Sequence, residues 1–150
     1  MPSKKNTKYL SLLVLFFTFS FGFSQNTSKF KVVLDAGHGG EDPGAIKNGI
    51  KEKDIVLDVV LKIGKILEKN NSIEVVYTRK TDVIIGLKER ANIANKAKAN
   101  LFISVHCNGV KSTAARGTET FVMGMSRTDT NLDIAKKENG VIFLEKDYNE

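Results

Sequence analysis

Apolar strand-like runs alternate with amphipathic helical patterns along most of this chain. The runs Phe30–Ala36, Ile73–Tyr77 and Leu101–Val105 are apolar and rich in β-branched residues, as buried strands are. The first gap contains a helical apolar spacing over residues 52–69, and the second contains an alanine-rich one over residues 87–99. Such alternation predicts an α/β fold, in which helices flank a mostly parallel sheet.

The C-terminal part carries a weaker pattern. Thr118–Met123 is predicted to be a fourth strand, and Asn131–Glu145 a final helix. The Asn139-Gly140 pair disfavours a continuous helix and leaves its boundary open. The chain then closes on a polar segment, so we expect the sheet to lack its C-terminal strand and helix, as in a truncated chain.

Residues 1–24 have a composition of their own. They contain three lysines and no acidic residue; an apolar run from Tyr9 to Phe23 follows the lysines, and small residues stand at Gly22 and Ser24. This pattern predicts a secretory signal peptide cleaved after Ser24; the alternative is an N-terminal membrane anchor. We therefore expect a linker over residues 25–30, a domain over residues 31–150, and export to the periplasm or cell envelope.

Composition excludes several classes of protein. With 41% hydrophobic and 27% charged residues, the chain is neither disordered nor collagenous. A single cysteine excludes an internal disulfide framework and a multi-cysteine zinc site. Removal of residues 1–24 lowers the net charge from +6 to +3, and the remaining lysines are dispersed, so no nucleic-acid partner is expected.

The two histidines each follow a predicted buried strand. His38 lies in a glycine-rich loop after the first strand, and His106 directly follows the third. Because ligands bind at the carboxyl ends of parallel strands, both imidazoles are expected at one edge of the sheet, where they could bind a metal. A carboxylate is the expected third ligand, and Glu52 begins the first helix at that edge. Other acids compete by position: Glu41, Asp42 and Asp54.

Six motifs then point to a family. They are LDAGHGGEDPGA (34–45), GIKEKD (49–54), TRKTD (78–82), LKERANIAN (87–95), SVHCN (104–108) and GTETF (117–121). In this order, from about residue 31 to 137, they resemble the zinc-dependent N-acetylmuramoyl-L-alanine amidases. The resemblance implies an α/β fold and Zn²⁺ bound by His38, Glu52 and His106. It also implies hydrolysis of the amide between N-acetylmuramic acid and L-alanine in peptidoglycan.

The chain departs from that family near its C-terminus. The family carries a catalytic glutamate in a segment like LVELGF, and neither Glu145 nor Glu150 matches it. We therefore assign no catalytic residue and place that glutamate beyond residue 150. An inactive, zinc-containing wall-binding module is the alternative function, and a zinc peptidase is disfavoured because no HExxH helix is present. Cys107 replaces the alanine usual in the family, and we expect it to be a small buried hydrophobe.

The sequence leaves two possible roles for several polar residues in or near these motifs. Asp35 either bonds a ligand histidine or faces solvent, and Arg79 either meets an acidic stem-peptide group or pairs with Asp82. Asn108 either contacts substrate or forms a turn. The default for Arg90 and Glu119 is structural. Peptidoglycan is the expected partner; no activator protein can be named, and no oligomer is expected.

Overall fold

The computed structural model describes residues 28–108, 114–122 and 129–144. The predicted signal peptide therefore lies outside the described residues. Among the helices that are described, none is long and apolar enough to cross a bilayer.

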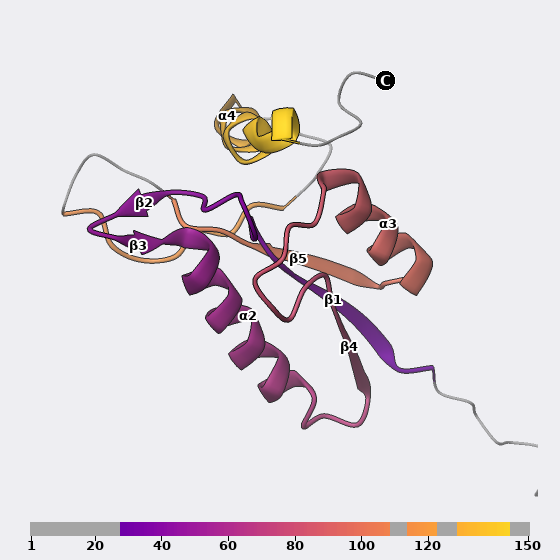
Figure 1. Ribbon diagram of the computed structural model, residues 1–150. Helices are drawn as coiled ribbons and strands as arrows, with labels where there is room; N and C mark the ends of the chain where they lie inside the picture. Colours follow the sequence, from indigo (N-terminus) through magenta and orange to yellow (C-terminus); the bar gives the residue numbers. More distant parts are fainter. Residues whose placement is uncertain (1–27, 109–113, 123–128, 145–150) are drawn as a thin grey trace, which may run out of the picture.

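Three parallel strands form the central sheet in the order β4-β1-β5 (Figure 1). They are β1 (Phe30–Ala36), β4 (Ile73–Tyr77) and β5 (Leu101–Val105), with the bounds predicted from sequence. Strand β1 pairs with both neighbours, so it is central and carries the most deeply buried residues. All three strands end at the same edge of the sheet, as parallel pairing requires.

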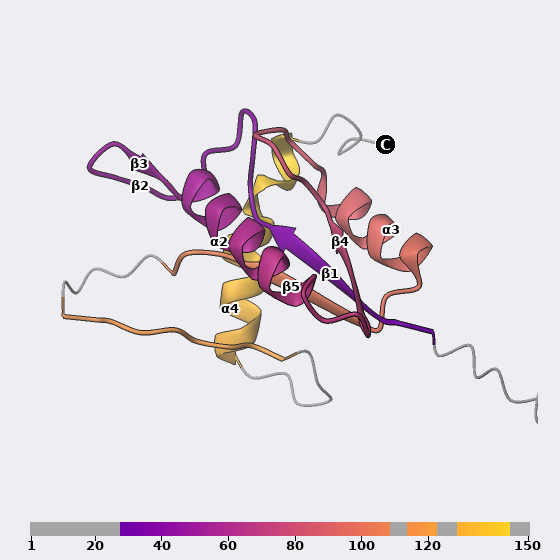
Figure 2. The same ribbon diagram turned by 90° about the horizontal axis from the view of Figure 1, so that it is seen from below.

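Two helices cover opposite faces of this sheet (Figure 2). They are α2 (Glu52–Leu67), between β1 and β4, and α3 (Leu87–Ala97), between β4 and β5. Because the chain steps to one side of β1 and then back past it, right-handed crossovers place the two helices on different faces. Both helices end two residues earlier than the sequence pattern predicts.

The core lies between β1 and α2. Val56 and Val60 of α2 are fully buried against Val32 and Leu34 of β1. These positions recur at i and i+4 on the helix and at i and i+2 on the strand, so each element presents one apolar face to the other. This packing fixes the first turn of α2 relative to the end of β1.

A small hairpin that the sequence analysis did not predict precedes α2. It joins β2 (Ile46–Lys47) to β3 (Ile50–Lys51) in antiparallel pairing. At its tip Asn48 and Gly49 have φ values of 52° and 76°, the left-handed conformation that a two-residue hairpin turn requires. The hairpin leads directly into Glu52, the first residue of α2.

The C-terminal prediction is partly wrong. Residues 118–122, the described part of the expected strand, have no regular structure and pair with no strand in the described sheet. The expected final helix is α4 (Asp129–Glu138), followed by a 3₁₀ helix, η1 (Asn139–Leu144). The α-helix ends at the Asn139-Gly140 pair, where glycine disfavours helical backbone. Helix α4 lies across the end of the sheet where the loops after β1 begin (Figure 1).

Candidate metal centre

Four side chains converge at this end of the sheet. His38 follows β1, Glu52 begins α2, His106 follows β5 and Glu138 ends α4. One ligand atom from each lies within 4.8 Å of every other. The structure therefore brings together the three predicted ligands, His38, Glu52 and His106, and adds Glu138.

The separations between these atoms fit a tetrahedral metal site. The distances from His38 Nε2 to Glu52 Oε1, from His106 Nδ1 to Glu52 Oε1 and from His106 Nδ1 to His38 Nε2 are all 3.2 Å. Glu138 Oε2 lies 2.8 Å from His106 Nδ1 and 3.6 Å from His38 Nε2. Ligands about 2.0–2.1 Å from a tetrahedral zinc ion are about 3.3 Å apart. Glu138 therefore faces the other ligand atoms through Oε2, while its buried Oε1 has no hydrogen-bond partner and lies 3.8 Å from Lys137 Nζ.

Asp42 orients the imidazole of His38. Its Oδ2 lies 2.7 Å from His38 Nδ1, which leaves Nε2 facing the other ligand atoms. A carboxylate on the far nitrogen is the usual partner of a metal-binding histidine. Asp42, a competing ligand by sequence position, is therefore the partner of His38 instead. Asp35 is not that partner, because its oxygens accept hydrogen bonds from Thr78, Arg90 and Ser104 and it is buried.

Glu52 is held by the backbone on both of its oxygens. Oε2 accepts from the Ala45 N–H at 2.9 Å, and Oε1 accepts from the Cys107 N–H at 2.7 Å. Burial raises its pKa, but the hydrogen bonds with His106 and His38 and these two N–H groups outweigh burial and hold the pKa well below its usual range. These contacts therefore favour the anionic form of Glu52.

The surroundings of His38 favour its protonated form. The hydrogen bond with Glu52, opposed by burial and supported by Asp42, raises the pKa of His38 to about 9. A cation, either a proton or a metal ion, is thus favoured between these carboxylates. Binding a metal at Nε2 must release that proton.

Two glycines give the ligands room. A Cβ at Gly37 would overlap the ring of His106. At Gly44, where φ is +64°, a Cβ would lie 2.6 Å from the His38 ring and 2.8 Å from Glu52. These two glycines of the predicted loop therefore allow the backbone to approach the ligands closely.

Arg79 does not occupy the position expected of a substrate contact. It is 3% exposed, and its N–H groups donate to four backbone carbonyls, those of Ala36, Gly37, Lys53 and Thr81. Asp82, its alternative partner, instead pairs with Lys53 at 2.5 Å. Its burial and these bonds favour a structural role for Arg79.

The remaining predicted residues differ in burial. Asn108 and Glu119 are both exposed, and Asn108 donates from Nδ2 to Glu119 Oε2 at 2.6 Å. Cys107 is partly buried against the core, and burial raises the pKa of its thiol. Arg90 is buried beside Asp35, in agreement with the structural role expected for it.

Glu138 is the residue that sequence reasoning missed. It ends a polar helix, and neither its spacing from the histidines nor the local composition marks it as different from Glu145 or Glu150. Only the placement of α4 across the sheet edge brings it to the other ligands.

Comparison with known proteins places the chain in an amidase family. The family model described as N-acetylmuramoyl-L-alanine amidase matches residues 32–146. The endolysin of Bacillus phage SPP1 is 52% identical over 90 residues, which cover 60% of this chain and 32% of the phage protein. The N-acetylmuramoyl-L-alanine amidase AmiA of Escherichia coli K12 is 44% identical over 93 residues, covering 61% of this chain and 32% of AmiA.

Solved structures of amidases align with part of this chain. The catalytic domain of CwlV, an N-acetylmuramoyl-L-alanine amidase from Bacillus (Paenibacillus) polymyxa, aligns with a TM-score of 0.54 at 42% identity, over 57% of this chain and 49% of that one. An N-acetylmuramoyl-L-alanine amidase from Clostridium difficile 630 aligns with a TM-score of 0.55 at 35% identity, over 59% and 49%. The matched part thus spans about half of these solved chains and about a third of the two relatives above.

Proposed function

Because the chain belongs to the N-acetylmuramoyl-L-alanine amidase family, we propose that it takes part in zinc-dependent hydrolysis of the amide between N-acetylmuramic acid and L-alanine in peptidoglycan. The observation that supports this proposal is the convergence of His38, Glu52 and His106 from three different elements. Two histidines and one carboxylate form a usual ligand set of hydrolytic zinc sites.

The residues of the chain would share the work as follows. His38, Glu52 and His106 would hold the ion. Because the two imidazoles are neutral and only one ligand is a carboxylate, the ion with its ligands would keep a net positive charge. Asp42 keeps the proton of His38 on Nδ1, so that Nε2 stays available. When bound, zinc supplies Lewis-acid chemistry that polarises the scissile carbonyl and acidifies water.

Glu138 supports a second candidate function. With its Oε2 at the fourth corner, the described side chains fill every position of a tetrahedral site. Closed four-ligand sites are typical of structural zinc, whereas catalytic sites keep one position for water or substrate. A non-catalytic wall-binding module with a structural ion would have this arrangement. Hydrolysis, in contrast, requires Glu138 to leave that corner.

Digestion of purified peptidoglycan distinguishes the two functions. The zinc-loaded chain and Glu138→Ala are incubated with peptidoglycan, and the products are identified by mass spectrometry. An amidase releases stem peptides with a free L-alanine amino group, and we expect more of them from Glu138→Ala. The sequence predicts no general base among these residues, and such a base contributes about 10²–10⁴-fold to the rate, so release is followed over hours against zinc alone.

Two controls complete this experiment. His38→Ala should lose stoichiometric zinc and all release, whereas Lys62→Ala, which removes only an exposed ion pair with Asp58 on α2, should change neither. If both the wild-type chain and Glu138→Ala bind zinc and release nothing, the structural-zinc candidate is the correct one. Cuts within the stem peptide would instead identify a peptidase.

We also propose that the chain is exported, since its proposed substrate lies outside the cytoplasmic membrane. Residues 1–24 support this proposal through their basic start, apolar run and small residues at the end. N-terminal sequencing of the protein isolated from cells should then begin at Gln25. A mature protein that retains Met1 would contradict cleavage.

A further inference from the structure

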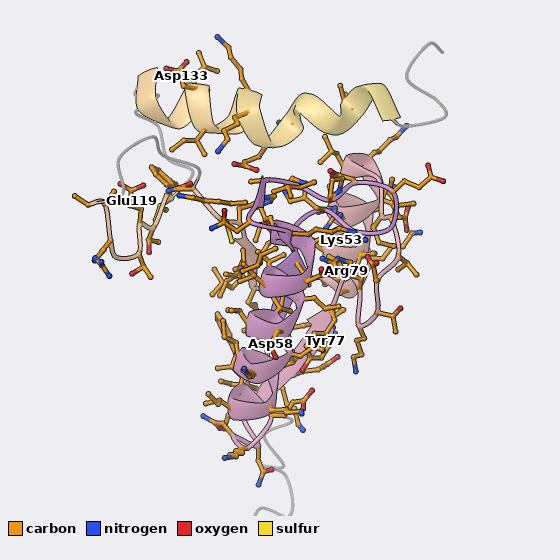
Figure 3. The ribbon with its side chains drawn as sticks, turned by 60° about the vertical axis from the view of Figure 1, so that its left-hand side comes forward. Lys53, Asp58, Tyr77, Arg79, Glu119 and Asp133 are labelled. Carbon is orange, nitrogen blue, oxygen red and sulfur yellow. The ribbon has the colours of Figure 1, made fainter. Side chains whose placement is uncertain are left out.

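Two buried arginines lie beneath the loop that carries His38. Arg79 follows β4 and is 3% exposed; Arg90 belongs to α3 and is 6% exposed. Figure 3 shows Arg79 beside Lys53, at the end of α2 nearest to α4. Neither side chain has a role in the chemistry proposed above, yet both are buried close to the proposed ligands.

Arg90 holds the loop from the side of α3. Its Nη1 donates to Asp35 Oδ1 at 2.6 Å and to the Ala36 carbonyl at 2.8 Å. Its Nη2 donates to the carbonyl of His38 itself at 2.8 Å. The ion pair with Asp35 compensates the buried charge, so the guanidinium is fixed while it binds the ligand's own backbone.

Arg79 joins the segments of two different ligands. Its Nε donates to the Ala36 carbonyl at 2.9 Å, and its Nη2 donates to the carbonyls of Gly37 at 2.8 Å and Lys53 at 2.9 Å. Gly37 precedes His38, and Lys53 follows Glu52. Burial, and then the neighbouring Arg90, lowers the pKa of Arg79.

The backbone of the loop explains why arginine stands at these positions. Three successive carbonyls, those of Ala36, Gly37 and His38, accept hydrogen bonds from the two guanidinium groups. His38 has φ 59°, in the left-handed region that a non-glycine residue seldom adopts. Buried carbonyls need partners, and the planar fork of arginine reaches several acceptors at once, whereas lysine offers a single nitrogen.

We propose that Arg79 and Arg90 are positioning residues for the metal centre, and that Arg79 sets the separation of the His38 and Glu52 ligand atoms. This proposal rests on the proposed zinc site. The guanidinium of Arg79 bridges the two chain segments, and Arg90 keeps the left-handed backbone of His38 in place. Together they hold Nε2 and Oε1 at a distance that suits one small ion.

The test measures metal binding rather than hydrolysis. Zinc affinity of the full chain, of Arg79→Lys and of Arg90→Lys is measured by competition with a chromophoric chelator, and Co²⁺ is titrated to record its visible absorption. Loss of a group that orients metal ligands typically weakens metal affinity by about 10–100-fold. We expect losses of this size, with a changed Co²⁺ spectrum because the ligand geometry relaxes.

Two control variants separate positioning from general stability. Val60→Ala opens a cavity in the core between α2 and β1, away from the ligands. It should lower the stability of the fold and leave both zinc affinity and the Co²⁺ spectrum unchanged. Arg116→Lys removes an exposed guanidinium and should have no effect on any of these measurements.

Each outcome decides the matter. Wild-type affinity and spectrum in a folded Arg79→Lys and Arg90→Lys would overturn the proposal, and so would an equal loss of affinity in Val60→Ala. If only one arginine variant folds, its affinity decides. If both fail to fold while Val60→Ala folds, the arginines serve stability and the proposal is wrong. A wild-type chain that takes up no zinc refutes the proposed function itself, which is a separate result.

Discussion

The stability of the metal-free protein should fall as the pH rises through the neutral range. The pKa of His38 is raised from 6.5 to about 9 in the folded state by Glu52 and Asp42. Between these pH values the folded chain binds one more proton than the unfolded chain, so raising the pH favours unfolding. One pKa unit corresponds to about 1.4 kcal/mol, and the shift therefore contributes about 3 kcal/mol. This contribution is complete below pH 6.5 and lost above pH 9.

Urea unfolding followed by circular dichroism measures this effect directly. The chain is kept metal-free with a chelator, and its free energy of unfolding is determined at a series of pH values across that window. His38→Gln is the matched control, since glutamine keeps a polar side chain that does not titrate. We expect the slope with pH to be much smaller in this variant.

Saturating zinc should reverse the trend. A metal ion at Nε2 takes the place of the proton, so zinc binding is favoured as the pH rises and its stabilisation grows. The curves with chelator and with zinc should therefore diverge toward high pH. A metal-free stability that is flat or rises between pH 6.5 and 9, or a slope that persists in His38→Gln, would refute the reasoning.

Three further substitutions test other parts of the structure. Gly37→Ala places a methyl group in the ring of His106, so zinc affinity measured by chelator competition should fall by about 10–100-fold, and unchanged affinity would disprove the clash. Asp42→Asn weakens the partner of His38 Nδ1, and calorimetry should record a zinc affinity lower by a similar factor. Val60→Ala removes buried methyl groups and should lower the free energy of unfolding in urea by about 2 kcal/mol; a change near zero would place this residue outside the core.

The sheet and three of the four convergent side chains could be predicted because their signals are local. The apolar, β-branched composition of β1 predicts a buried strand without reference to other segments. Parallel pairing then places its end beside the end of β5. His38 and His106 follow these strand ends, so the fold rule alone places them together. The same rule places Glu52 at this edge but leaves it in competition with other acids, and the family resemblance singled it out.

The remaining features depend on contacts that leave no pattern in the sequence. Glu138 reaches the site only through the docking of α4, which no periodicity encodes. Arg79 was expected to meet either an acidic stem-peptide group or Asp82, but its acceptors are backbone carbonyls, which are the same for every residue type. The predicted strand at Thr118–Met123 has β-forming residues, yet a strand exists only where a partner supplies the ladder, and residues 118–122 have none in the described sheet.

The central place of β1 would also determine when the proposed metal ion can bind during biosynthesis. Its neighbours β4 and β5 both lie downstream in the chain, and the imidazoles of His38 and His106 are separated by 68 positions. Contacts that close such long loops form late in folding, because chain entropy is lost before the contact stabilises anything. A nascent polypeptide that has emerged only through β4 would contain two of the four convergent side chains, His38 and Glu52. Binding of the ion by both histidines would therefore require that β5 has already paired with β1.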